Sequence, residues 1–125
     1  HLLGATRIGH GVAAANDDRL MDFMAENSIA MECCLTSNFQ TGACTNIAEH
    51  PIKMFLEKGM LVTLNTDDPG VSGIEIADEY QLAKEEVGLT SKQLIQIQLN
   101  GVHAAFASDP LKQKLIKMAQ ANNKV

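Results

Sequence analysis

Three short apolar segments, each followed by a helix-like segment, place the strongest constraint on how this 125-residue chain can fold. The segments are residues 6–11, 28–38 and 60–65, and they recur at intervals of about 24 to 31 residues. Strands that alternate with helices at such spacing pair in parallel through right-handed crossovers. Each segment is apolar almost throughout, which indicates burial on both faces, as in a barrel or a doubly wound sheet. The sequence therefore predicts an α/β fold.

The segments between and after these strands carry helix signals. Apolar side chains recur at helical spacing, Thr90 and Gln93 have the pattern of a capping box, and Gly59 and Gly88 mark helix ends. We predict helices over 16–27, 50–59, 74–88, 90–106 and 108–120. The first four residues have the pattern of a helix that ends at Gly4, so we expect the chain to begin inside an element.

The composition favours one folded domain, because 46% of the residues are hydrophobic and 20% are charged. A net charge of -5 gives no basic surface for a phosphate backbone, so we expect no nucleic-acid partner. No apolar stretch approaches the roughly 20 residues that cross a bilayer and no secretion leader is visible, so we expect no membrane partner and a cytoplasmic location. The odd set of Cys33, Cys34 and Cys44 lacks metal-site spacing, which favours buried free thiols.

All three predicted strands run into polar residues at their carboxyl ends. The first leads to His10, the second to Ser37 and Asn38, and the third to the adjacent Asp67 and Asp68. In parallel α/β folds this edge of the sheet binds ligands, because the strand-to-helix loops and the helix N-termini converge there. An aspartate and a histidine on one rim suit a divalent metal of the zinc type, although two such residues do not define a site by spacing alone.

Each of these residues also has a structural interpretation. His10 could be a hydrogen-bonded core histidine, and Ser37 and Asn38 are typical turn formers. One of the two aspartates could cap a helix or shape the turn at Pro69, which leaves the other aspartate without a structural role.

The other polar candidates are interpreted as structural. His103 lies within a predicted helix, and His50 lies just before the start of another. Glu79 and its acidic neighbours open the helix over 74–88, where the helix dipole favours negative side chains.

Several motifs together resemble the C-terminal part of adenosine deaminase, especially its bacterial form. They are "RIGHG" (7–11), "CLTSNFQTG" (34–42), "HPIKMFLEKG" (50–59), "LNTDDPGVSGIEIADEY" (64–80) and "LIQIQLNGVHAAF" (94–106). The resemblance covers essentially the whole chain. "TDDP" alone would be a weak signal, but the combination is specific.

This resemblance implies a TIM (β/α)8 barrel of the metal-dependent hydrolase type. The family uses one Zn²⁺ to hydrolyse adenosine to inosine and ammonia, and 2'-deoxyadenosine to the corresponding 2'-deoxy product, in purine salvage. Carried over by motif, His10 matches the catalytic histidine beside the metal-bound water, Asp67 matches a zinc ligand, and Asp68 matches a residue that binds a purine ring nitrogen. The purine nucleoside is the implied substrate.

The resemblance also implies that the chain is incomplete as an enzyme. The family's early His-x-His pair, its third histidine ligand and its proton-transferring glutamate have no match here. Residues 1–125 would be the C-terminal portion of a single deaminase domain, with about three β/α units and without the N-terminal barrel strands. We expect the isolated chain to be inactive and to pair with the missing N-terminal half or another copy of itself, because open strand edges attract partners.

Two other interpretations stay open from the sequence. Adenine and AMP deaminase relatives share the two-aspartate motif, so the substrate could be another 6-aminopurine. Alternatively, the chain could be a small α/β binding module without catalysis, in which the two aspartates serve as caps.

Overall fold

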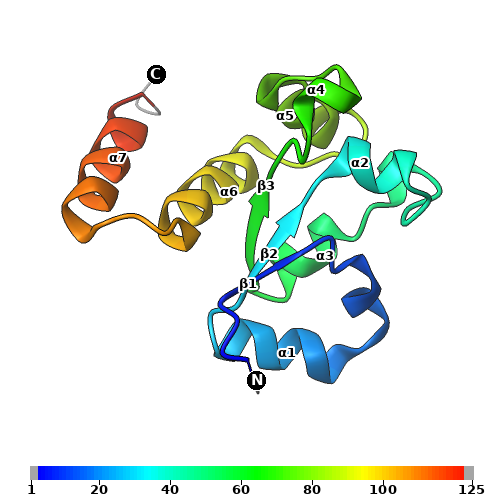
Figure 1. Ribbon diagram of the computed structural model, residues 1–125, viewed down its shortest axis with the longest axis horizontal. Helices are drawn as coiled ribbons and strands as arrows, with labels where there is room; N and C mark the ends of the chain where they lie inside the picture. The colour runs from blue at the N-terminus through cyan, green and yellow to red at the C-terminus, as the bar shows by residue number, and fades with distance from the viewer. Residues whose placement is uncertain (1–2, 123–125) are drawn as a thin grey trace.

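The computed structural model describes residues 3–122, and its centre is a parallel sheet (Figure 1). The strands of this described part are β1 (Arg7–Gly9), β2 (Ala30–Cys33) and β3 (Leu61–Leu64), in the order β1-β2-β3. Ile8 lies opposite Met31, and Met31 lies opposite Val62, with both pairs of strands parallel. The predicted α/β class and the parallel order along the chain are confirmed.

Helices connect and follow the strands. The five predicted helices are present, four of them with shorter bounds, and two short helices over 35–40 and 69–72 were not predicted. The helices are α1 (Asp18–Glu26), α2 (Leu35–Gln40), α3 (Ile52–Glu57), α4 (Pro69–Ser72), α5 (Ile76–Glu85), α6 (Ser91–Ala104) and α7 (Asp109–Asn122), with 3-10 turns η1 (Val12–Asn16) and η2 (Ile47–Glu49). The capping box of Thr90 and Gln93 is present at the start of α6. Gly59 follows α3 with φ 76, a left-handed conformation that suits glycine. The expected helix end before Gly4 falls mostly outside the described residues.

Two details of the strand prediction are wrong. The second strand ends at Cys33, so Ser37 and Asn38 lie in helix α2 and are not turn residues. The first strand is not buried on both faces: Ile8 is 38% exposed, because β1 pairs on one side only within the described sheet. Strands β2 and β3 are mostly buried, as predicted.

The core lies between one face of the sheet, which contributes Met31, Cys33, Val62 and Leu64, and the helices packed on that face. Its most buried large side chains include Phe55, Met21, Met31 and Ile97, which come from three helices and a strand. Helix α6 is held against β3, where the side-chain amide of Asn100 donates to the Val62 carbonyl at 2.9 Å. Helix α7 packs on α6 and lies away from the sheet. Helix α6 therefore supports β3, and α7 is held through its packing on α6.

The cysteines and the apolar character of the helices were also predicted from the sequence. Cys33 and Cys34 are buried free thiols, as predicted, whereas Cys44 is only half-buried. None of the helices found over residues 3–122 has both the length and the apolar character needed to span a bilayer.

Candidate functional site

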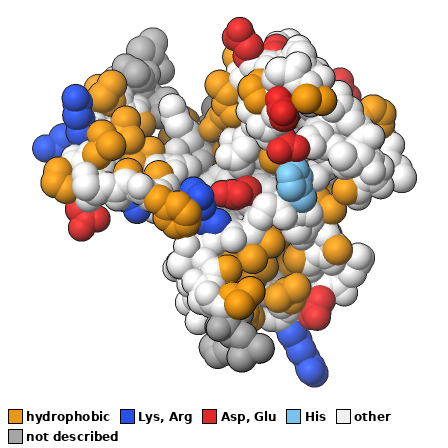
Figure 2. All heavy atoms as spheres, viewed as in Figure 1, with side chains coloured by type: hydrophobic (Ala, Val, Ile, Leu, Met, Phe, Trp, Pro, Cys, Tyr) orange, Lys and Arg blue, Asp and Glu red, His pale blue; other side chains and the backbone are white. Residues whose placement is uncertain are grey.

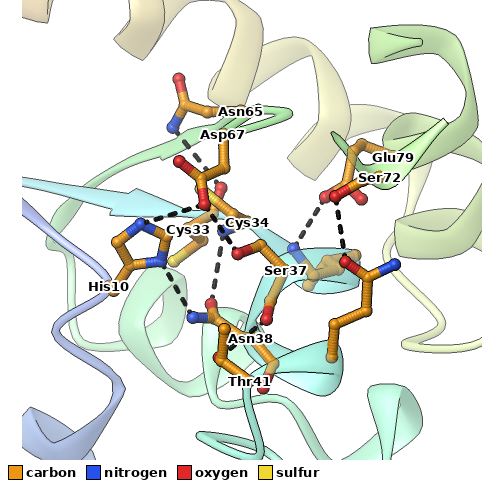
Figure 3. A network of polar contacts seen from close by, with 12 residues as sticks. His10, Cys33, Cys34, Ser37, Asn38, Thr41, Asn65, Asp67, Ser72 and Glu79 are labelled. Atoms are coloured by element: carbon orange, nitrogen blue, oxygen red, sulfur yellow. Dashed lines mark hydrogen bonds and ion pairs between the residues drawn. The ribbon is translucent and has the colours of Figure 1, made fainter. Parts of the chain in front are cut away.

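The polar residues at the strand ends lie together on one rim of the sheet (Figure 3). His10 follows β1, Ser37 lies in α2 after β2, and Asp67 follows β3. The Ser37 hydroxyl donates to Asp67 Oδ2 at 2.7 Å, and His10 Nε2 lies 3.6 Å from the same oxygen. The structure thus confirms the prediction that these side chains share a rim, although they come from three separate β/α units.

The backbone turns sharply at two of these residues. His10 has φ 54 and Asp67 has φ 60, both in the left-handed region that residues other than glycine seldom adopt. Such a conformation costs on the order of 1 kcal/mol or more, and the surrounding structure must maintain it. These two turns follow β1 and β3, and the His10 and Asp67 side chains face one another across the rim (Figure 3).

Asp67 and Asp68 have different local roles. Asp68 is the N-cap of α4, and its Oδ1 accepts from the Val71 N–H at 3.1 Å, with Pro69 in the first helical turn. The capping interpretation therefore holds for Asp68. The Asp67 carboxylate instead contacts His10 and Ser37.

A buried pair of side chains lies behind His10. Asn38 is 0% exposed, and its side-chain nitrogen lies 3.1 Å from His10 Nδ1. The Asn38 side-chain oxygen lies 3.0 Å from His50 Nε2, and His50 is 3% exposed. His50 is buried and hydrogen-bonded, as the structural interpretation predicts. The structure also shows that Asn38 connects His50 to His10 on the rim.

Glu79 also contributes to the rim, which the dipole interpretation from the sequence did not foresee. Its side chain is fully buried, and its two carboxylate oxygens accept from the backbone N–H groups of Leu35 at 2.7 Å and Thr36 at 3.0 Å. These amides open α2, so the carboxylate satisfies donors that have no partner within the helix. Glu79 therefore fixes the start of the helix that carries Ser37 and Asn38.

The sequence carries a signal for two of these residues, of which Asn38 is already expected at the end of the second strand. Glu79 lies on the same helical stripe as Ala83 and Val87, which are buried four and eight positions later. An acidic residue on the apolar side of a helix predicts a buried hydrogen-bonded carboxylate. Asn38 follows β2 at the same edge where His10 follows β1. No comparable signal marks His50.

Burial sets the protonation of two groups near the rim. It lowers the pKa of His50 from 6.5 to about 4, so this ring is neutral near pH 7. Burial, together with the negative charges of Asp67, Glu79 and Glu32, raises the pKa of the Cys34 thiol to about 12. Cys34 therefore stays protonated and is a poor nucleophile or metal ligand.

The rim offers part of a metal site. Within residues 3–122 no group of three or more His, Cys, Asp or Glu side chains is placed to hold a metal ion. Asp67 is nevertheless suited to supply one ligand, because its carboxylate is half-exposed at the strand ends and both of its described contacts fall on Oδ2. Figure 2 shows a histidine and acidic side chains gathered on this open face, with hydrophobic side chains around them.

Comparison with known proteins places this site in a family context. A sequence profile described as adenosine deaminase matches residues 1–121. The adenosine deaminase of Aliivibrio fischeri is 56% identical over 117 residues, which make up 94% of this chain and 35% of that protein. The chain thus spans about 35% of the length of this curated relative.

Solved structures give the same fold. An adenine deaminase from Arthrobacter aurescens superposes with a TM-score of 0.91 at 24% identity, over 96% of this chain and 37% of that one. A Burkholderia ambifaria amidohydrolase with bound zinc superposes with a TM-score of 0.86 at 24% identity, over 97% of this chain and 34% of that one. The parallel sheet and its helices are therefore part of a (β/α)8 barrel.

Proposed function

The chain belongs to the adenosine deaminase family, and from that premise we propose that it is the C-terminal portion of a zinc-dependent enzyme that hydrolyses adenosine and 2'-deoxyadenosine. In this reaction water replaces the 6-amino group of the purine, so adenosine gives inosine and ammonia, and 2'-deoxyadenosine gives 2'-deoxyinosine and ammonia. The observation that carries the proposal is the placement of His10 and Asp67, 3.6 Å apart, at the carboxyl ends of parallel strands. That edge is where (β/α)8 barrels hold their active sites.

Three side chains have proposed roles in the complete enzyme. Asp67 would supply one zinc ligand, and the hydroxyl of Ser37 orients its carboxylate by donating at 2.7 Å. A bound zinc ion would lower the pKa of a water molecule and so supply a nucleophile near neutral pH. His10 presents Nε2 beside Asp67, where it can hydrogen-bond an oxygen held at the rim. Asp68 would bind a ring nitrogen of the purine.

The proposed substrate is adenosine because of the identity of the relatives. The Aliivibrio fischeri protein, an adenosine deaminase, is 56% identical, whereas the Arthrobacter adenine deaminase is 24% identical and supports the fold alone. Purine salvage is the metabolic role that fits such a substrate. Turnover of adenosine, 2'-deoxyadenosine, adenine and AMP, compared side by side, tests the choice.

We propose that residues 1–125 do not catalyse the reaction alone. Their described part provides no complete set of metal ligands, and one carboxylate does not hold a catalytic zinc. The remaining ligands would come from the preceding barrel strands.

A chimera tests both proposals. Residues 1–125 replace the matching segment of the Aliivibrio fischeri adenosine deaminase. Inosine and ammonia are measured for three proteins: the chimera, the 125-residue chain, and the Aliivibrio protein that lacks the matching segment. We expect turnover by the chimera only. A folded, zinc-loaded chimera that is inactive on adenosine would overturn the assigned activity, and turnover by the homogeneous 125-residue chain would overturn its predicted inactivity.

A further inference from the structure

A chain of hydrogen bonds connects a buried backbone amide to His10. The Ile52 N–H donates to His50 Nδ1 at 3.1 Å, and His50 Nε2 lies 3.0 Å from Asn38 Oδ1. The Asn38 side-chain nitrogen in turn lies 3.1 Å from His10 Nδ1, as Figure 3 shows for this last contact. This series of hydrogen bonds therefore ends at the imidazole ring of His10, which faces Asp67.

The direction of these bonds is fixed at one end by Ile52. A backbone N–H can only donate, so Nδ1 of His50 must accept and carries no proton. In the neutral ring the proton is then on Nε2, which donates to Asn38.

A second backbone amide gives the same direction independently. The Cys34 N–H donates to Asn38 Oδ1 at 3.4 Å, so this atom of the amide must be the oxygen. The other atom is the NH2 group, which donates to His10 Nδ1.

We propose that Asn38 and His50 are positioning residues that hold His10 as the tautomer with its proton on Nε2, an inference that rests on the proposed function of the rim. Since Nδ1 of His10 accepts from Asn38, the neutral ring presents an N–H toward Asp67 Oδ2. The opposite tautomer would place the Nε2 lone pair against a carboxylate oxygen. A fixed donor at Nε2 can hold an oxygen beside Asp67 in one orientation.

The surroundings keep this arrangement from reversing. Asn38 and His50 are buried, so water does not compete for their polar atoms. His50 stays neutral near pH 7, because burial lowers its pKa to about 4. A ring with one proton has one donor, and Ile52 determines where that donor lies.

Replacement of the side-chain NH2 group of Asn38 by an oxygen tests the proposal. In Asn38→Asp the carboxylate can still accept from His50 and from Cys34, but it can no longer donate to His10. We expect Nδ1 of His10 to gain a proton and to donate to the new carboxylate, while the volume of the side chain at position 38 is preserved. The matched control is Asn27→Asp, which introduces the same group at the exposed end of α1.

The experiment uses the zinc-loaded chimera with ¹⁵N-labelled histidine, and His10→Asn identifies the His10 resonances. The parent and Asn27→Asp should show protonated Nε2 and bare Nδ1 at His10, whereas Asn38→Asp should show protonated Nδ1. We expect kcat for adenosine to fall about 100-fold in Asn38→Asp with KM little changed. His50→Gln keeps a donor toward Asn38 and should retain the parent tautomer and most of kcat. His50→Leu removes that donor and leaves the Cys34 N–H as the one described donor to Asn38 Oδ1, so kcat should fall further in this variant than in His50→Gln.

Each result decides the inference. A protonated Nδ1 at His10 in the parent, an unchanged tautomer in Asn38→Asp, or a reversed tautomer with unchanged kcat would overturn it. The spectrum requires no turnover, so a chimera that is inactive on adenosine would contradict the proposed function while the tautomer is still read directly.

Discussion

Oε2 of Glu79 accepts a hydrogen bond from the Leu35 N–H at 2.7 Å, although the two residues are 44 positions apart in the sequence. The contact joins the first turn of α5 to the first turn of α2. Because α2 carries Ser37 and Asn38, the position of both rim residues depends on this buried carboxylate. Helix α2 therefore begins at the point where the Glu79 carboxylate accepts hydrogen bonds from its first backbone N–H groups.

Replacement of Glu79 should destabilise the protein. Glu79→Gln turns one acceptor into a donor that faces a backbone N–H, at an expected cost of about 2 kcal/mol, and Glu79→Ala leaves two buried N–H groups unpaired at about 3 kcal/mol or more. The exposed Glu85→Gln is the control and should change stability by less than about 0.5 kcal/mol. Urea denaturation of the chimera measures all three. A Glu79→Gln protein as stable as its parent would show that the carboxylate is not needed.

Replacement of the two adjacent aspartates, Asp67 and Asp68, should have different effects on zinc binding. Asp67→Ala removes the proposed ligand, so zinc and activity should be lost together. Asp68→Ala should keep most of its zinc and lose roughly 2 to 4 kcal/mol of transition-state stabilisation through weaker substrate positioning. Metal analysis beside steady-state kinetics on the chimera distinguishes them, and a zinc-replete, active Asp67→Ala enzyme would overturn the assignment.

Acidification should destabilise the fold through His50. Its pKa is about 4 when folded and 6.5 when unfolded, so between these values the unfolded state binds more protons. Stability is unaffected by this group above pH 6.5 and falls as the pH drops toward 4, with a loss of about 2 kcal/mol between pH 7 and 5. His50→Gln removes the titrating group, so the variant should lose about that much less on acidification. Equal losses in the two proteins, measured by urea denaturation of the chimera at both pH values, would exclude His50 as the cause.

Gly11 should resist enlargement. A Cβ atom at this position would lie 2.8 Å from Met31 Cε and 3.2 Å from Ile8 Cγ2, so the end of the buried Met31 side chain would have to move. We expect Gly11→Ala to cost about 1 to 3 kcal/mol. Gly101→Ala is the control, since no atom lies within 4 Å of its added Cβ and the site is inside α6. That change should stabilise by about 0.5 to 1 kcal/mol, and equal effects at the two positions would contradict the packing argument.

The sequence predicts those features that depend on nearby residues. The helix ends at Thr90 and Gly59, the parallel strand order and the shared rim of His10 and Asp67 all follow from spacing and capping signals. The helical state of Ser37 could not be predicted in this way, because the carboxylate that starts its helix lies more than 40 residues away. Local propensity favours a turn there, and the tertiary contact overrides it.

Burial was harder to predict for the same reason. Ile8 has the apolar neighbours of a buried strand, yet its exposure depends on what lies beside β1 and not on its own segment. The hydrogen bonds that connect His50 to His10 through Asn38 join three separate elements, so no window of sequence contains them. The sequence shows which polar residues are present but does not show which of them contact one another.

The polar rim joins residues far apart along the chain: His10 and Asn38 are 28 positions apart, and Ser37 and Asp67 are 30. Contacts of such separation form late in folding, because the intervening chain must lose its conformational freedom first. We therefore expect the rim to take shape only after all three strands have paired, and α6 and α7 to form earlier from local contacts. During that interval the apolar strands remain available to neighbouring molecules. A substitution that slows the pairing of β1 with β2 would thus lower the yield of folded protein in the cell while leaving the site of each correctly folded molecule unchanged.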